Sequence, residues 1–261
     1  MNRPDNGAST AARQQMAAAL AAGSSSEWSD AFASVPRHLF VPRFYRQGTN
    51  GTWQPIAWGE PGYLEAVYSD AALTTQLDDR GVPTSSSSQP SIMLSMLQAL
   101  DAAEGHRVFE LGTGTGYNLG LLAHRLGDTN VTSVDIDPGL IETAVRNLQQ
   151  AGFSPTVAVG DGAQGYPSRA PYDRIISTVG VHMIPQPLLQ QAPPARSSSF
   201  LSATASCGPQ SPARATPLAG SWSHRRTSWP DAPRVPRRSS RRRTSSRRPT
   251  AACRRRTCWD G

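Results

Sequence analysis

Short apolar runs alternate with helical runs from residue 107 to residue 179, and this alternation constrains the fold more than any other feature. The sequence predicts strands at 107–111, 131–136, 156–160 and 172–179, separated by helices at 117–126 and 138–152. Strands that alternate with helices form parallel sheets covered on both faces. We therefore expect an α/β fold with a Rossmann-like, doubly wound parallel sheet.

Upstream of this alternation the pattern is weaker. An Ala-rich stretch predicts a helix at 11–22, and Gly, Pro, Asn and Trp indicate an irregular loop at 47–62. A serine-rich turn then precedes a helix whose first turn holds Pro90. We divide this part of the chain into an N-terminal helical and loop region, residues 1–80, and a core, residues 81–192.

The composition changes abruptly after Ala192. Residues 1–192 hold 11 Arg and 17 Asp plus Glu, a net charge of −6, whereas residues 193–261 hold 15 Arg and 2 Asp, a net charge of +13. The chain's net charge of +7 therefore comes from the tail alone. Because residues 193–261 contain few large apolar side chains, we expect them to be disordered.

The expected location rests on two features that the first 192 residues lack. They contain no cysteine, and no apolar run approaches the roughly 20 residues that a membrane span requires. We expect a cytoplasmic protein that does not contact membranes, and we predict no metal site.

Glycine recurs between the first core strand and its helix, at Gly112, Gly114 and Gly116. Glycine lets the backbone turn sharply and lets a ligand approach without meeting a Cβ, although tight strand-to-helix turns use it too. The GxGxG spacing differs from the GxGxxG of dinucleotide binders, which disfavours NAD. Asp135 ends the second strand, where a carboxylate accepts hydrogen bonds from ribose hydroxyls. Together these features favour an adenosine ligand.

Four longer runs carry a family resemblance: VFELGTGTGYNLGLLAHRLG, VTSVDIDPGLIETAVRNL, VGDGAQGYPSRAPYDRIISTVG and IPQPLLQQ. With AFASVPRHLFVP near the N-terminus, they resemble the protein-L-isoaspartate O-methyltransferase family, and the resemblance covers residues 31–191. It implies the class I methyltransferase type of sheet and S-adenosyl-L-methionine as cofactor. It also implies methyl transfer to the carboxylate of L-isoaspartyl residues in damaged proteins, a protein-repair activity.

The resemblance also implies which residues bind the cofactor. They are Glu110, Gly112, Thr113, Gly114, Gly116, Asp135, Asp161 and Gly162. Among them, Asp161 would contact the adenine amino group. Asp173 begins the fourth strand, and the resemblance implies that its role is mainly structural.

Ser88 is the predicted catalytic residue. The family's reactive loop has the form TISxP, which falls on residues 86–90, SSSQP, so that Ser88 matches the family's Ser while Ser86 and Ser87 replace Thr and Ile. The resemblance implies that this hydroxyl engages the substrate carboxylate. A carboxylate is ionised at neutral pH and needs no strong base, so catalysis would rest mainly on placing it in line with the methyl group.

Two other functions remain open. The departures at Ser86 and Ser87, and His182 in TVGVHMIP, are compatible with a carboxyl methyltransferase that acts on a natural-product precursor peptide or a small acid. The run RRSSRRRTSSRRP in the tail is compatible with a non-catalytic protein that binds nucleic acid through phosphate contacts.

A frameshift near Ala192 is the explanation we favour for the tail. Back-translating residues 193–206 with GC-rich codons and reading from the third base gives PGALVLLPLG, a turn and a hydrophobic strand similar to what the family has there. In that case the C-terminal strands of the sheet are missing. We then expect a recognisable cofactor half with an uncovered edge at the fourth strand, and poor stability and activity.

Overall fold

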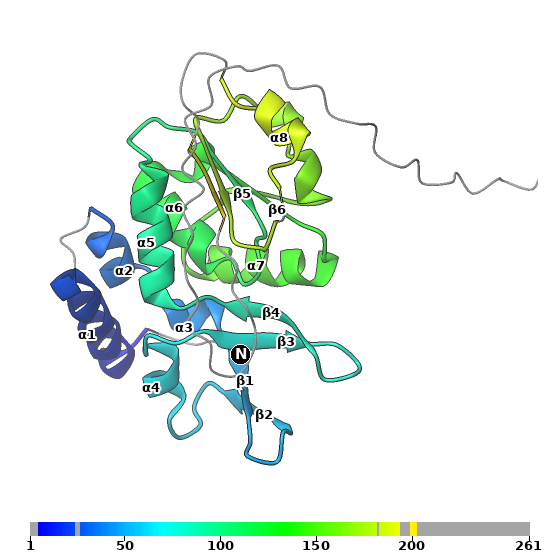
Figure 1. Ribbon diagram of the computed structural model, residues 1–261. Coiled ribbons are helices and arrows are strands. Elements are labelled where there is room, and N and C mark those ends of the chain that lie inside the picture. Colours follow the sequence, from blue (N-terminus) through cyan, green and yellow to red (C-terminus); the bar gives the residue numbers. More distant parts are fainter. Residues whose placement is uncertain (1–4, 24–26, 182, 194–198, 203–261) are drawn as a thin grey trace, which may run out of the picture. The chain divides into compact units, whose positions relative to one another are not determined.

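The structure, a computed structural model, describes residues 5–23, 27–181, 183–193 and 199–202 (Figure 1). All of them belong to one compact unit, Met1–Ser223. The expected disorder and frameshift of residues 193–261 fall almost wholly outside the described residues, as does His182. No helix in the described ranges is long and apolar enough to cross a membrane.

A five-stranded parallel sheet forms the core of the unit. Its strands are β5 (Val108–Leu111), β6 (Val131–Asp135), β7 (Thr156–Val159), β8 (Arg174–Ser177) and β9 (Ser199–Ser202), in the order β7-β6-β5-β8-β9. Because β5 pairs with β6 on one side and β8 on the other, the strand order reverses at β5. Ligands of such sheets bind outside the carboxyl ends of the strands at this reversal. The predicted Rossmann-like fold is confirmed.

The edge of β8 differs from the expectation. β9 pairs with β8 in parallel, with Ile175 opposite Phe200 and Ile176 opposite Leu201. Within the described residues the edge of β8 is therefore paired with β9, whereas the expectation that the C-terminal strands are missing falls mostly outside the described residues and stays a prediction.

Helices between these strands begin where the sequence predicts. α5 (Pro90–Leu100), α6 (Tyr117–Leu126) and α7 (Pro138–Gln150) precede or follow the first three strands, and α8 (Gln186–Gln190) follows β8. Asp137 caps α7, since its carboxylate accepts from the backbone N–H groups of Gly139 at 2.7 Å and Leu140 at 3.3 Å. The short 3-10 helices η1 (Asp128–Asn130), η2 (Gly162–Gln164) and η3 (Pro167–Arg169) lie in the loops.

The N-terminal region contains a second sheet that the sequence did not predict. Its strands β1 (Arg43–Gln47), β2 (Trp53–Ala57), β3 (Leu73–Leu77) and β4 (Pro83–Ser87) run antiparallel in the order β2-β1-β3-β4. The expected loop at 47–62 includes β2, and the expected serine-rich turn is β4. An Asn50-Gly51 pair connects β1 to β2, and it is a hairpin signal that could have indicated them.

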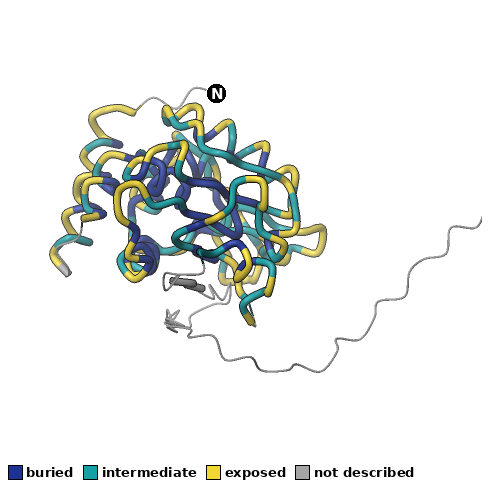
Figure 2. The backbone as a smooth tube through the Cα atoms, turned by 90° about the horizontal axis from the view of Figure 1, so that it is seen from above, coloured by how far each residue is buried: buried dark blue, intermediate teal, exposed yellow. Residues whose placement is uncertain are grey.

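Four helices accompany this sheet, α1 (Gly7–Gly23), α2 (Ser29–Ser34), α3 (Arg37–Phe40) and α4 (Tyr63–Val67). They share one hydrophobic core with the parallel sheet: Phe40 and Phe32 pack around the ring of Tyr117 at the start of α6. Gly120 permits this contact, because a Cβ there would lie 2.9 Å from the Phe40 ring. Figure 2 shows the buried segments in the interior, with exposed segments around them. The N-terminal helices are thus held against the cofactor half.

Hydrogen bonds of Gln191 join the loop between β7 and β8 to α8. Its side chain accepts from the N–H of Tyr166 at 2.8 Å and donates to the carbonyls of Gln164 at 2.8 Å and Pro187 at 3.0 Å. Its own carbonyl accepts from the N–H of Tyr172 at 2.8 Å. One buried side chain therefore ties the loop before β8 to α8.

Candidate functional site

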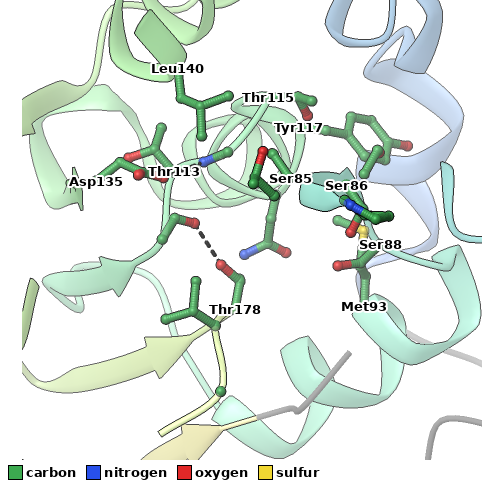
Figure 3. A pocket seen from close by; sticks show the side chains of 18 of the residues that line it. Ser85, Ser86, Ser88, Met93, Thr113, Thr115, Tyr117, Asp135, Leu140 and Thr178 are labelled. Atoms are coloured by element: carbon green, nitrogen blue, oxygen red, sulfur yellow. Dashed lines mark hydrogen bonds between the residues drawn. The ribbon is translucent and has the colours of Figure 1, made fainter. Parts of the chain in front are cut away.

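A cavity of about 360 Å³ lies between β4 and the carboxyl ends of β5, β6 and β8 (Figure 3). Residues 83–88 line one side and residues 112–115 line another, with Asp135 and residues 178–180 at the strand ends. This is the position at which the strand order reverses. The sequence therefore places a serine segment opposite a glycine turn across one cavity.

The glycine turn follows β5 and requires glycine for two reasons. Gly112 has φ +94°, and a Cβ there would lie 2.6 Å from Val179 Cγ1 and 2.8 Å from Thr178 Oγ1. Gly114 has φ +52°, and its Cβ would project toward the serine segment, 3.7 Å from Ser85 Oγ. Glycine thus keeps open the space between the turn and β4.

Asp135 lies beside this turn at the end of β6. Its Oδ2 accepts from the N–H of Gly114 at 2.9 Å, and its Oδ1 accepts from the N–H of Asp137 at 3.1 Å. The residue is half-buried and lines the cavity. The structure therefore brings the predicted carboxylate and the predicted glycine turn together.

Gly116 ends the turn and lets two helices approach each other. It has φ +86°, and a Cβ there would lie 3.3 Å from the Cβ of Ala144 in α7. Asn147, one helical turn further along α7, donates to the carbonyl of Thr115 at 3.1 Å. Gly116 does not line the cavity, and its role in the structure is to let α7 hold the turn.

Glu110 is buried beneath the turn and does not line the cavity. Its carboxylate accepts from Asn118 Nδ2 and from Ser133 Oγ, both at 2.7 Å, and Ser133 Oγ is itself 2.7 Å from Thr113 Oγ1. Burial raises the pKa of Glu110 to about 7, and the charge of Asp135 adds to the rise against the two hydrogen bonds. Glu110 therefore supports Thr113, which does line the cavity, from below.

Ser88 lines the cavity at the end of β4. Its carbonyl accepts from Arg37 Nη2 at 2.9 Å. The next residue, Gln89, donates to Asp70 at 3.0 Å, and Asp70 also accepts from the N–H of Ser91 at the start of α5. Hydrogen bonds from both sides thus hold the segment that carries Ser88.

Asp161 and Gly162 are not among the residues that line the cavity. Asp161 is exposed and caps η2 by accepting from the N–H of Ala163 at 3.0 Å. Gly162 is buried, and a Cβ there would lie 2.6 Å from Leu111 Cγ, so it allows the loop to pack against β5. The structural role expected for Asp173 is matched by its hydrogen bond from the N–H of Arg107, at 2.9 Å.

The sequence did not single out several residues at this site. Thr178 donates to the carbonyl of Gly112 at 2.5 Å and joins β8 to the glycine turn. Tyr117 and Met93 line the cavity from the starts of α6 and α5 (Figure 3). Thr178 could have been found, because it is the last residue but one of the strand predicted at 172–179, at the carboxyl edge where ligands bind. Within the described ranges, no three His, Cys, Asp or Glu side chains gather as a metal site.

The sheet order, the glycine turn after β5 and the carboxylate ending β6 are those of a Rossmann-like nucleotide-binding fold, and the fold is that of class I methyltransferases. The sequence profile of the protein-L-isoaspartate(D-aspartate) O-methyltransferase (PCMT) family matches residues 13–195. The chain belongs to this family, as the resemblance predicted.

Curated relatives have the same family name. The chain is 38% identical over 165 residues to protein-L-isoaspartate O-methyltransferase 1 of Archaeoglobus fulgidus. This alignment covers 62% of this chain and 65% of that protein. It is 34% identical over 170 residues to the Pyrococcus abyssi protein-L-isoaspartate O-methyltransferase. That alignment covers 64% of this chain and 67% of that protein. The chain thus spans about two thirds of the length of the curated relatives it matches.

Solved structures agree with the fold. A protein-L-isoaspartate O-methyltransferase superposes with a TM-score of 0.59 at 28% identity, over 74% of this chain and 54% of that chain. A Plasmodium falciparum structure, described as a protein-L-isoaspartate O-methyltransferase in complex with S-adenosyl-L-homocysteine, gives a TM-score of 0.56 at 13% identity, over 74% and 84%.

Proposed function

We propose that this chain transfers a methyl group from S-adenosyl-L-methionine to the carboxylate of L-isoaspartyl residues in proteins or peptides. The observation that carries the proposal is the position of Ser88 and the glycine turn on the same cavity, in a chain of the PCMT family. A repair enzyme of this kind has damaged proteins as its partners.

The residues around the cavity fit the cofactor. The bare backbone at Gly114 leaves a space that a side chain would fill. The carboxylate of Asp135 faces the same cavity and suits the two hydroxyls of a ribose. S-adenosyl-L-homocysteine in the P. falciparum structure supports the same ligand class. Gly112, Thr113, Gly114 and Asp135 would hold the cofactor, which supplies the methyl group when bound.

Ser88 would orient the acceptor. A hydroxyl donates one hydrogen bond, and a carboxylate accepts such bonds strongly because it is charged. Placing the oxygen along the line of displacement accounts for most of what this reaction needs from the protein. Gly162 would contribute to the adenine side by letting the loop after β7 pack against Leu111, and Asp161 would contact the adenine amino group.

The experiment compares two synthetic peptides that differ only in an L-isoaspartyl or an L-aspartyl residue. The purified full-length chain should label the isoaspartyl peptide from methyl-labelled S-adenosyl-L-methionine and leave the aspartyl peptide unlabelled. Ser88→Ala should lower kcat by about tenfold to a hundredfold, the effect of one hydrogen bond to a charged group. Ser95→Ala, on the exposed face of α5, is the matched control.

Three outcomes would count against the proposal. Equal labelling of the two peptides would contradict the substrate. Labelling only of natural-product precursor peptides or small acids would favour a carboxyl methyltransferase that acts on those substrates. Full activity in Ser88→Ala would contradict the role of Ser88.

Normal turnover with one cooperative thermal transition would overturn the expectation that the tail leaves the chain unstable and inactive.

A further inference from the structure

The guanidinium of Arg37, on the short helix α3, is completely buried. It donates to the backbone carbonyls of Val67 at 2.8 Å, Ser69 at 3.2 Å, Ala71 at 3.1 Å, Ser88 at 2.9 Å and Ser87 at 3.4 Å. It also donates to Ser87 Oγ, from Nη2 at 3.3 Å and from Nε at 3.4 Å. Arg37 thus joins the segment before β3 to the end of β4.

These acceptors are neutral, and the ion pairs of the described residues do not include Arg37. Burial lowers the pKa of Arg37 to about 10, partly offset by the nearby Tyr117 and Asp70, so the group stays charged at neutral pH. A charged, planar fork can serve several carbonyls at fixed angles, which a Lys ammonium cannot. Among the described residues, backbone carbonyls and a hydroxyl therefore hold this buried cation directly, and Asp70 acts on it without an ion pair.

The contacts of Arg37 also extend to the opposite wall of the cavity. Its guanidinium carbon lies 5.7 Å from the centre of the Tyr117 ring, which follows the glycine turn and lines the cavity. One side chain therefore contacts both the serine segment and the first residue of α6.

We propose that Arg37 is a positioning residue that sets the place of Ser88 in the cavity by holding the carbonyls of Ser87 and Ser88 against α3. The expected effect of Arg37 on catalysis rests on the proposed function. The effect of Arg37 on the position of the serine segment does not depend on it. Arg37 does not line the cavity itself. It acts through the backbone of the serine segment.

Ser87 takes part in the same contact. Its side chain is buried, and its hydroxyl is the acceptor of Arg37 Nε. Ser87 stands where the family form has Ile, which has no hydroxyl to accept this bond. The hydroxyl therefore adds to the hold that Arg37 has on the serine segment in this chain.

The variants are Arg37→Met, which removes the donors, Arg37→Lys, which keeps the charge without the fork, and Ser87→Ala, which removes only the hydroxyl. Arg13→Met is the matched control. Arg13 is also buried, but it donates to the backbone carbonyl of Ala33 in α2 at 2.7 Å and to Asp5 at 2.8 Å.

Two measurements on the full-length chain test the proposal. Hydrogen–deuterium exchange of residues 83–89 should quicken by about tenfold or more in Arg37→Met, while exchange of residues 112–116 stays within about threefold of the wild type. The kcat for the isoaspartyl peptide should fall by about a hundredfold in Arg37→Met and Arg37→Lys, and by about tenfold in Ser87→Ala. The Kd for S-adenosyl-L-homocysteine should change by less than about threefold.

Unchanged exchange of residues 83–89 in Arg37→Met and Ser87→Ala would overturn the proposal, as would equal losses of kcat in Arg13→Met. If Arg37→Met does not fold, Ser87→Ala and Arg37→Lys decide the question by the same exchange measurement. If the wild type does not methylate the isoaspartyl peptide, the proposed function fails. The exchange result then still decides whether Arg37 positions the serine segment.

Discussion

Replacing Glu110 by Gln tests the role of the buried carboxylate beneath the glycine turn. Gln keeps the shape of the side chain and removes its charge. Its oxygen can accept from Asn118, as one carboxylate oxygen does now, and its amide can donate to Ser133 Oγ. Each partner therefore stays hydrogen-bonded, and the difference between the two proteins reports the buried charge.

The sign and size of the effect follow from the pKa. Burial raises the pKa of Glu110 from 4.5 to about 7, so the folded state holds the proton more tightly than the unfolded state. The stability that protonation provides is complete below about pH 4.5 and is lost as the pH rises to about 7. At 1.36 kcal/mol per unit, the wild type loses about 3 kcal/mol across this window, and Glu110→Gln does not.

The assay is urea unfolding of both proteins at pH 5 and pH 8. The advantage of Glu110→Gln in free energy of unfolding should grow by about 2.5 kcal/mol between the two pH values. Glu142→Gln is the control, because that side chain is exposed on α7 and paired with Arg146, and it should follow the wild type. A difference between Glu110→Gln and wild type that is the same at both pH values would refute the reasoning.

Three further substitutions test the glycine turn and its surroundings. Gly112→Ala should lower Tm further than Gly105→Ala, because both glycines have positive φ but only at Gly112 would a Cβ collide with other atoms. Gly112→Ala should also abolish stabilisation by S-adenosyl-L-homocysteine, which thermal melts with and without that ligand measure. Asp137→Ala removes the cap of α7 and its bond from Gln76, and should cost about 1 kcal/mol in urea unfolding. Asp135→Asn should weaken the Kd for S-adenosyl-L-homocysteine by about tenfold in calorimetry.

The parallel sheet could be predicted because its strands are buried and separated by helices. The strand expected at 172–179 is β8, Arg174–Ser177, and the helix expected to open at Pro138 does so. The glycine turn and Asp135 were predicted together because both follow from the position of the first two strands. Periodic burial and fixed spacing are local signals, which a single sequence contains.

The antiparallel sheet could not be predicted in the same way. β4 has the sequence PTSSS, without a large apolar side chain, and it is a strand because it pairs with β3. Arg37 was missed for a related reason. Its acceptors are backbone carbonyls 30 to 51 positions away, and no local pattern in the sequence indicates which carbonyls a distant side chain reaches.

Gln191 also sets an order of events during synthesis. The chain is made from its N-terminus and domains fold as they emerge. Tyr166, between β7 and β8, donates its N–H to a side chain made 25 positions later, so the loop obtains its final hydrogen bonds only after Gln191 has been added. A shift of reading frame before codon 191 would remove this tie, whereas the change in composition begins just beyond it. A shift of reading frame beyond codon 191 therefore leaves this side chain in the sequence, and with it the donor and acceptor groups that bind the loop before β8.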